Sequence, residues 1–371
     1  MTTYRKMCDL ECSLLGFGCM RFPTNKDGSI NEAKAEQMID EAMLAGINYY
    51  DTAYGYHGGD SERFLGKVLP KYPRESYFLT SKLPVYMLTS AEHAEQVLEE
   101  QLSRLNADYL DFYLLHALNR HTFDERVVGF DLLKLCEKWK KEGKVRHIGF
   151  SFHDDNETFE RILRYYPWDV CQIQYNYMDT ENQAGLKGLK LAGELGIPVI
   201  VMEPIRGGSL VRFPEEIKDA FAQACPGRNL ANIALSWVAT HPEVKVILSG
   251  ISNLAQLRDN LKTFRRFTPL TEAQMQGVAG VVELIRGRIR VPCTACRYCM
   301  PCPAGVDIPR AFAITNEEAM HGHTEVYRKQ YHRGKPETFA SKCVKCGACV
   351  SKCPQHINIP EKLSDVKNLF E

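Results

Sequence analysis

The feature that most constrains the fold is a regular alternation of short apolar segments with longer amphipathic ones between residue 14 and about residue 260. Seven apolar segments rich in β-branched and aromatic residues, together with a first short one at 14–16, make eight candidate strands. The seven are 48–53, 77–82, 109–116, 145–151, 170–176, 198–203 and 244–251. Most are almost continuously apolar, which is typical of parallel strands buried on both faces.

Candidate helices lie between these strands, for example at 32–45, 91–105, 130–141 and 184–195. Gly46, Gly143 and Gly196 each follow a helix and precede a strand, as C-terminal capping glycines do. Eight strands, each followed by a helix over about 250 residues, indicate a closed (β/α)₈ barrel rather than an open doubly wound sheet. No glycine-rich dinucleotide fingerprint follows the first strand, which also disfavours the open sheet.

Composition excludes several classes of function. Lys and Arg total 46, and so do Asp and Glu, so the chain has no cationic surplus for nucleic acid. No apolar run approaches the ~18 residues that a membrane span needs. The segment 1–10 contains Arg5, Lys6 and Asp9 and lacks the apolar core of a signal peptide. We therefore expect a cytoplasmic protein that binds neither nucleic acid nor membrane.

The cysteines divide the chain into two parts. Of the 14, eight lie in the last 80 residues: Cys293, Cys296, Cys299, Cys302, Cys343, Cys346, Cys349 and Cys353. Clustered cysteines in a reducing compartment indicate metal more often than disulfides. A helix is expected at 271–287, and Pro292 opens the cysteine-rich part. We therefore predict a barrel domain at 1–290 and a small, mainly helical metal-binding domain at 291–371.

This second part contains a repeat. The sequence Cys-Pro-Ala-Gly-Val-Asp-Ile-Pro from Cys302 is echoed by Cys-Pro-Gln-His-Ile-Asn-Ile-Pro from Cys353, and each echo closes a run of cysteines. The second run is C-x2-C-x2-C-x3-C-P, in which one tight loop supplies three thiolates to a 4Fe–4S cube. Zinc is the alternative, but zinc sites usually pair two separated C-x2-C elements. The spacing favours iron–sulfur.

The cysteine-rich part resembles a two-cluster ferredoxin of the helical type, with the interval 302–343 predicted to be amphipathic helix. In such ferredoxins the last cysteine of each run binds the other cluster. The resemblance implies one cluster on Cys293, Cys296, Cys299 and Cys353, and a second on Cys343, Cys346, Cys349 and Cys302. The first run departs from the pattern, because two residues rather than three separate Cys299 from Cys302, and the assignment of Cys302 depends on the resemblance alone.

Polar residues stand at the carboxyl ends of three consecutive predicted strands, where barrel enzymes hold their chemistry. Asp51 ends the second strand, Lys82 the third and His116 the fourth, and Tyr56 lies in the loop after Asp51. Each alone has an ordinary explanation as a helix cap, a solvated cation or a packed histidine. Together they indicate a catalytic group at one end of the barrel.

These residues, with Gly-Asp-Ser-Glu62 after them, resemble the aldo-keto reductases over about 10–265. The resemblance implies that Tyr56 is a general acid that protonates a carbonyl oxygen as hydride reaches its carbon. A phenol titrates near 10, so Lys82 would stabilise the phenolate, and Asp51 would keep Lys82 charged. His116 would orient and polarise the carbonyl oxygen.

The same resemblance implies an extended NADP(H) or NAD(H) molecule across the barrel mouth. Its candidate contacts are Ser151, Gln172, Met202, Gly207, Gly250, Ser252, Gln256 and Asn260. Asn253 and Gln256 stand where a basic residue often reads the 2′-phosphate, and Arg258 is a substitute, so the preference for NADP is slight. An ordinary loop capped by Ser252 or Asn253 also explains the segment 249–260.

Two functions follow from these patterns. The first is an iron–sulfur aldo-keto reductase that reduces an aldehyde or ketone with NAD(P)H, with a redox partner protein for the clusters. A hydride carries two electrons and a cluster carries one, and no flavin signature bridges them. The second is an electron-transfer or redox-sensing protein whose barrel binds nicotinamide without turnover.

Overall fold

The computed structural model describes residues 2–371, and the contacts between its residues divide the chain into two compact units. Unit 1 contains Met1–Gly207 and Asn229–Thr271, and unit 2 contains Gly208–Arg228 and Glu272–Glu371. Each unit has a buried core of its own, so they are described separately. The predicted boundary near residue 290 stays a prediction.

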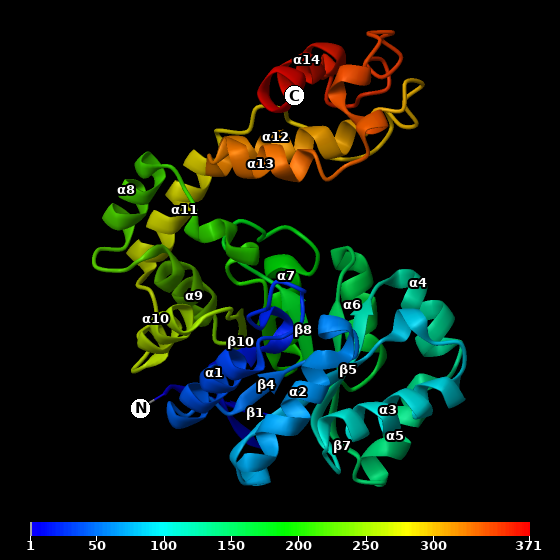
Figure 1. The fold of residues 1–371 in the computed structure, drawn as a ribbon, viewed down its shortest axis with the longest axis vertical. Helices are drawn as coiled ribbons and strands as arrows, with labels where there is room; N and C mark the ends of the chain where they lie inside the picture. The colour runs from blue at the N-terminus through cyan, green and yellow to red at the C-terminus, as the bar shows by residue number, and fades with distance from the viewer. Residues whose placement is uncertain (1) are drawn as a thin grey trace. The chain divides into compact units, whose positions relative to one another are not determined.

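Unit 1 is built on a closed barrel of eight parallel strands in the order β10-β3-β4-β5-β6-β7-β8-β9 (Figure 1). The strands are β3 (Leu15–Gly18), β4 (Tyr49–Asp51), β5 (Phe78–Leu83), β6 (Leu110–Leu118), β7 (Val145–Phe152), β8 (Val170–Gln174), β9 (Val199–Met202) and β10 (Val244–Gly250). All eight overlap or adjoin the predicted apolar segments. The predicted (β/α)₈ barrel is therefore confirmed.

Helices cover the outside of these strands, as Figure 1 shows for α2, α3, α5 and α6. The helices of unit 1 are α1 (Glu32–Leu44), α2 (Asp60–Val68), α3 (Ala91–Leu105), α4 (Arg120–Thr122), α5 (Leu132–Lys141), α6 (Asn156–Tyr165), α7 (Gly185–Glu194), α9 (Leu230–Thr240) and α10 (Leu254–Phe264). Side-chain oxygens of Asn31, Ser90 and Asp155 accept backbone N–H groups at their first turns. Gly46, Gly143 and Gly196 take the left-handed conformation expected after a helix.

A two-stranded antiparallel hairpin, β1 (Tyr4–Met7) with β2 (Leu10–Ser13), precedes the barrel and was not predicted. Met7 and Cys12 pack with Tyr49, Phe112 and Val170 of the barrel core. Four-residue strands are too short to show a periodicity in the sequence. The hairpin is held instead by tertiary contacts at the start of the barrel strands.

Unit 2 is helical. It contains α8 (Glu215–Ala224), α11 (Glu272–Arg286), α12 (Ile308–His321), α13 (Thr324–Tyr331) and α14 (Ile359–Phe370). The interval predicted as amphipathic helix at 302–343 contains two helices, because Gly322 is left-handed and the chain turns there before α13. α12 packs on both α13 and α14 around Phe312, Leu363 and Phe370. None of the helices described within 2–371 has the length and apolar character needed to cross a membrane.

Candidate active site and cluster loops

Three of the four predicted catalytic residues lie together in the barrel, around the buried ion pair between Lys82 and Asp51. Lys82 Nζ lies 2.6 Å from Asp51 Oδ1, 2.8 Å from the carbonyl oxygen of Thr52 and 3.4 Å from the Tyr56 hydroxyl. Lys82 is fully buried and Asp51 is 3% exposed. The adjacent strands β4 and β5 bring these side chains together at their carboxyl ends.

The environment of this group favours a charged lysine and a protonated phenol. Burial is the largest influence on Lys82 and lowers its pKa, but Asp51 and Tyr56 outweigh burial and the net pKa is raised. Burial raises the pKa of Tyr56, and the Lys82 ammonium is the main opposing influence. The phenol therefore keeps its proton at neutral pH and lies beside a cation that stabilises its anion.

His116 is the fourth member, and its ring centroid lies 6.1 Å from that of Tyr56. Burial, followed by the charges of Lys82 and His153, lowers the pKa of His116 to about 3. The imidazole is therefore neutral near pH 7. Its Nδ1 is buried without a hydrogen-bond partner among residues 2–371. Tyr86, which the sequence did not single out, lies 6.0 Å from the same ring and is 48% exposed.

A bulge in β6 sets the direction of His116. The pairing of β6 with β7 shifts register between Leu115 and Leu118, and Ala117 takes a φ of 55°. Such bulges redirect side chains at the rims of barrels. Ser151 Oγ accepts the Ala117 N–H at 2.7 Å, so this serine supports the bulge from the neighbouring strand.

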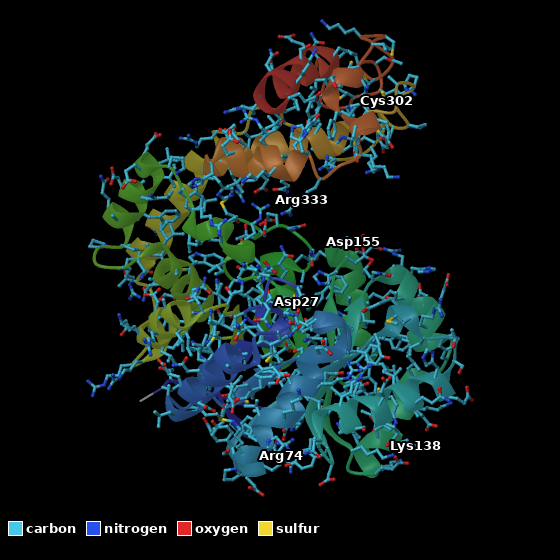
Figure 2. The ribbon with its side chains drawn as sticks, in the orientation of Figure 1. Asp27, Arg74, Lys138, Asp155, Cys302 and Arg333 are labelled. Carbon is cyan, nitrogen blue, oxygen red and sulfur yellow. The ribbon has the colours of Figure 1, made fainter. Side chains whose placement is uncertain are left out.

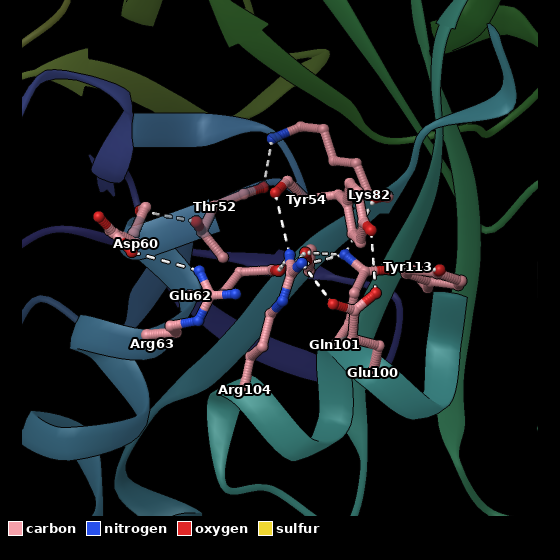
Figure 3. Close-up of polar contacts among 12 residues, drawn as sticks. Thr52, Tyr54, Asp60, Glu62, Arg63, Lys82, Glu100, Gln101, Arg104 and Tyr113 are labelled. Carbon is pink, nitrogen blue, oxygen red and sulfur yellow. Dashed lines mark hydrogen bonds and ion pairs between the residues drawn. The ribbon is translucent and has the colours of Figure 1, made fainter. Parts of the chain in front are cut away.

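A second buried polar group lies behind Lys82, between β5, α2 and α3 (Figure 3). Glu62 is fully buried and accepts hydrogen bonds from Ser81 at 2.6 Å, Gln101 at 2.6 Å and Arg104 at 3.1 Å. Gln101 Nε2 also donates to the carbonyl oxygen of Lys82 at 3.2 Å. This network fixes the backbone from which Lys82 projects. Of its members, sequence reasoning noted only Glu62.

The loop that carries Tyr56 is fixed by the same network. Arg104 donates to the carbonyl oxygen of Tyr54 at 3.2 Å and lies over the Tyr54 ring. Gly59, at the end of the 3₁₀ turn η2 (Tyr56–Gly59), is left-handed with a φ of 97°. A Cβ atom there would lie 2.9 Å from Arg63 Nη1 and 3.1 Å from Arg104 Nη1. The turn therefore favours glycine mainly for its conformation, and a larger residue would also displace the ends of these arginines.

The predicted nicotinamide contacts lie at the strand ends, and several already bond within the protein. Ser151 and Gln172 are register partners on β7 and β8, and Gln172 Nε2 donates to Asp51 Oδ2 at 3.1 Å. Gln172 therefore also holds the Lys82–Asp51 pair. Met202 ends β9 and is half-buried, and Gly207 is left-handed with a φ of 65°.

The segment after β10 is ordered by its own side chains. Ser252 donates to Gln256 Oε1 at 3.0 Å, and the buried Asn260 donates to Ser249 at 2.8 Å. Asn253 caps α10 by accepting the Gln256 N–H, which is one of the two capping residues considered from the sequence. Arg258 makes a two-pronged ion pair with Glu41 at 2.8 and 2.9 Å. Arg258 is therefore bound to Glu41 and is not a free cation for a cofactor phosphate.

Arg21, which follows β3, is a cation that sequence reasoning did not identify. Its aliphatic carbons occupy the place where a Gly250 side chain would lie, and its guanidinium is 3.6 Å from Glu203 and 3.5 Å from the carbonyl oxygen of Gly207. The guanidinium therefore spans two of the predicted cofactor-contact glycines. No motif in the sequence marks this residue.

The eight cysteines of unit 2 form two sets. The thiols of Cys293, Cys296 and Cys353 are close enough to Cys299 to raise its pKa, after burial as the main cause, and all four line one small cavity. In the same way, Cys343, Cys302 and Cys346 raise the pKa of Cys349, again after burial. In each set the last cysteine of one run lies with the first three of the other, as the resemblance implied.

The two cysteine loops have the same backbone shape. The residue before and the residue after the middle cysteine are left-handed in both: Ala295 and Arg297 around Cys296, and Lys345 and Gly347 around Cys346. Among residues 2–371, no three His, Cys, Asp or Glu side chains converge to hold a single metal ion. A four-iron cube instead takes its thiolates at separate corners.

Comparison with known proteins agrees with both parts of the chain. The model of the aldo/keto reductase family matches residues 14–283, and that of the 4Fe–4S dicluster domain matches 292–357. An aldo-keto reductase of Mycolicibacterium vanbaalenii is 31% identical over 266 residues, covering 70% of this chain and 88% of the relative. The NADH-specific methylglyoxal reductase of Escherichia coli is 26% identical, covering 68% and 90%.

A solved structure extends this likeness to the fold. The holo form of the aldo-keto reductase AKR11C1 from Bacillus halodurans superposes with a TM-score of 0.65 at 27% identity, covering 76% of this chain and 96% of that one. The family match includes the whole barrel and the group around Lys82. The chain belongs to the aldo/keto reductase family and carries a 4Fe–4S dicluster domain after its barrel.

Proposed function

We propose that this oxidoreductase reduces an aldehyde or ketone to an alcohol with hydride from NADPH or NADH, with Tyr56 as the proton donor. The observation that carries the proposal is the position of Lys82 Nζ between Asp51 at 2.6 Å and Tyr56 at 3.4 Å, fully buried. A buried ammonium beside a phenol stabilises the phenolate, which a phenol that donates its proton requires.

Each residue of the site would have a separate role in the reaction. Tyr56 donates its proton to the carbonyl oxygen, and the negative charge left on the phenolate is balanced by Lys82. Asp51, held by Gln172, keeps Lys82 charged and in place. His116, neutral at physiological pH, donates a hydrogen bond to the carbonyl oxygen as charge develops there.

The donor groups at the strand ends fit a nicotinamide dinucleotide. Hydroxyl and amide groups of Ser151 and Gln172 suit a carboxamide, and Ser252 with the N-terminus of α10 suits phosphate oxygens. Arg21 adds a cation beside Gly207 and Gly250. The cofactor, when bound, would supply the hydride. The engagement of Arg258 with Glu41 leaves NADP and NAD equally supported.

We further propose that the dicluster domain holds two 4Fe–4S clusters. One is bound by Cys293, Cys296, Cys299 and Cys353, and the other by Cys343, Cys346, Cys349 and Cys302, in agreement with the two thiol sets. Anaerobic analysis should then give about eight iron and eight sulfide per chain. A value near four would reduce the count to one cluster. The partners we propose are a small carbonyl or alcohol substrate and a redox protein, in an oxygen-poor cytoplasm.

Replacement of Tyr56 by phenylalanine tests the proposed proton donor. Tyr56→Phe should lower the rate of carbonyl reduction by about 10²–10⁴-fold, with nicotinamide binding and iron content unchanged. Tyr54→Phe is the matched control, because the Tyr54 hydroxyl bonds to Glu100 at 2.9 Å, whereas Lys82 bonds to the Tyr56 hydroxyl. An unchanged rate in Tyr56→Phe would remove this tyrosine from the mechanism.

The alternative, a redox sensor that binds nicotinamide without turnover, predicts a different result for the unmodified protein. It would bind NAD(P)H and show cluster signals, yet reduce none of a broad panel of aldehydes and ketones. The intact Asp51, Tyr56, Lys82 and His116 group favours turnover.

A further inference from the structure

The two cysteine loops of unit 2 have an unusual charge. The segments 292–306 and 339–358 contain four Lys or Arg residues, Arg297, Lys342, Lys345 and Lys352, and no Asp or Glu, although the chain as a whole is neutral. All four are exposed, and none forms an ion pair within residues 2–371. Elsewhere in unit 2, Arg288, Arg290 and Arg328 pair with glutamates, whereas Lys329, Lys335 and Lys367 are exposed and form no ion pair among the described residues.

Apolar side chains are exposed between these cations. Tyr298 is 66% exposed, Val344 is 70% exposed and Val350 is 36% exposed. Each is adjacent in the sequence to a cysteine of the two sets or to one of the cations. The middle cysteines Cys296 and Cys346 are also exposed. Exposed apolar groups next to exposed redox ligands indicate a surface that a partner covers.

The two loops lie side by side. Cys353 lies with the first loop and Cys302 with the second, so the loops interleave. They lead into the N-termini of α12 and α14, which pack against each other, and Figure 1 draws both loops at that end of the helices. Figure 2 labels Cys302 there. We call the seven exposed residues Arg297, Tyr298, Lys342, Val344, Lys345, Val350 and Lys352 the cluster rim.

We propose that the cluster rim docks an acidic one-electron carrier protein. This inference rests on the proposal that the cysteines hold clusters. A carrier must approach the cluster closely, and the rim surrounds the most exposed ligands, Cys296 and Cys346. Exposed cations interspersed with exposed apolar side chains match a partner that has carboxylates next to its own apolar redox site.

Two other uses of the rim fit the structure less well. The cations also offset the negative charge of thiolate-bound clusters, but that role gives no use for the exposed Tyr298 and Val344. Nucleic acid is an alternative polyanion, but its affinity comes largely from the number of cations that contact phosphates, and the rim has only four. A small, weak and salt-sensitive protein interface fits best.

The test uses the full chain with its clusters reconstituted and an acidic flavodoxin as the probe, with binding measured by surface plasmon resonance. In the rim variant, Arg297→Glu, Lys345→Glu and Lys352→Glu are combined. In the matched control, three exposed lysines of the same unit that lie outside the two loops are reversed together: Lys329→Glu, Lys335→Glu and Lys367→Glu. Both variants change the net charge by the same amount.

We expect the unmodified chain to bind the flavodoxin more weakly as salt rises, and the rim variant to lose on the order of tenfold or more in association rate at low salt. The control should lose less than about twofold. Val344→Ser should weaken binding without changing its salt dependence. Equal losses in the two charge variants, or no binding by the unmodified chain, would overturn the proposal.

Two further measurements separate the alternatives. If the rim variant shifts the cluster potentials but binds the flavodoxin normally, the cations only tune the clusters and the docking proposal fails. If a single-stranded DNA oligonucleotide binds with the same dependence on the rim and the flavodoxin does not, the partner is nucleic acid. Iron analysis is made first, because a chain without clusters overturns the proposed function and the docking proposal together.

Discussion

The cations of the barrel site and of the cluster rim lie in opposite environments. Lys82 is fully buried and bonds to a carboxylate, a carbonyl oxygen and a phenol. Lys345 and Arg297 of the rim are exposed and unpaired within residues 2–371. A buried cation beside a phenol can stabilise the phenolate that forms when the proton is lost. Exposed, unpaired cations can instead pair with carboxylates of another molecule. This difference is the basis of our proposal that the two units have different partners, a small molecule and a macromolecule.

The sharpest test of this contrast removes one cation from each region. Lys82→Met leaves Asp51 buried without its partner, so we expect a loss of about 3–5 kcal/mol in the free energy of unfolding and a collapse of carbonyl reduction. Lys345→Met should leave both the melting temperature and carbonyl reduction unchanged. Thermal unfolding followed by circular dichroism, with iron content as a check on unit 2, measures both. Equal destabilisation by the two changes would contradict the contrast.

The network behind Lys82 gives the second prediction. Gln101→Leu deprives the Tyr113 hydroxyl of its acceptor at 2.6 Å and Glu62 of a donor, both fully buried. We expect a loss of about 1–3 kcal/mol, because buried polar groups are left unpaired. If the network also positions Lys82, kcat falls while KM stays unchanged, and Gln101→Glu does not restore it. Arg63→Leu, which removes only an exposed pair with Asp60, is the control.

A third prediction concerns pH and the hairpin beneath the barrel. His147 Nε2 lies 3.1 Å from Asp9 in the hairpin turn, and its Nδ1 lies 3.8 Å from Asp169. Burial lowers the pKa of His147, but bonds to Asp169 and Cys8 outweigh burial and raise it to about 10. A raised pKa contributes stability that is complete below about 6.5 and is lost as the pH rises towards 10.

We therefore expect the stability of the barrel to decrease by about 2 kcal/mol between pH 6.5 and 10, after allowance for solvent screening at this partly exposed site. His147→Gln should flatten this dependence and leave the clusters unaffected. Urea unfolding at several pH values measures the change. A steeper loss in His147→Gln than in the unmodified protein would contradict the assignment.

The strands of the barrel could be predicted from the sequence, but part of the polar network around its site could not. The barrel strands were predictable because segments such as 145–151 are apolar on both faces, and Asp51 and Lys82 stood out as polar residues at the ends of such segments. Gln101 and Arg104 did not, because polar residues on a helix usually face solvent. Their burial arises only when α2 and α3 pack together.

The cluster loops show the complementary case. The spacing of the cysteines predicted iron–sulfur chemistry, but the partition into two sets came from a resemblance, because spacing alone does not say which loop Cys353 joins. The left-handed residues Ala295, Arg297 and Lys345 carry no sequence signal, since none is glycine. The rim was concealed for a different reason. Its cations are few, and they are recognised only by their exposure beside the two cysteine sets, because other lysines of unit 2, such as Lys329, are also exposed.

The smallest predicted effect tests the shape of the loops. Gly347 has a φ of 75°, and a Cβ atom there would meet nothing within 4 Å, so Gly347→Ala adds conformational strain without a clash. The cost should be about 1 kcal/mol, the penalty for an ordinary residue in the left-handed region. Faster loss of cluster absorbance to a chelator, with an unchanged melting temperature of the barrel, is the expected result. Arg297 occupies the equivalent position with a φ of 64°, so Arg297→Gly should have the opposite sign and slow that loss. If both changes accelerate cluster loss, the backbone conformation is not what limits the loops, and the side chain of Arg297 contributes to holding the cluster directly.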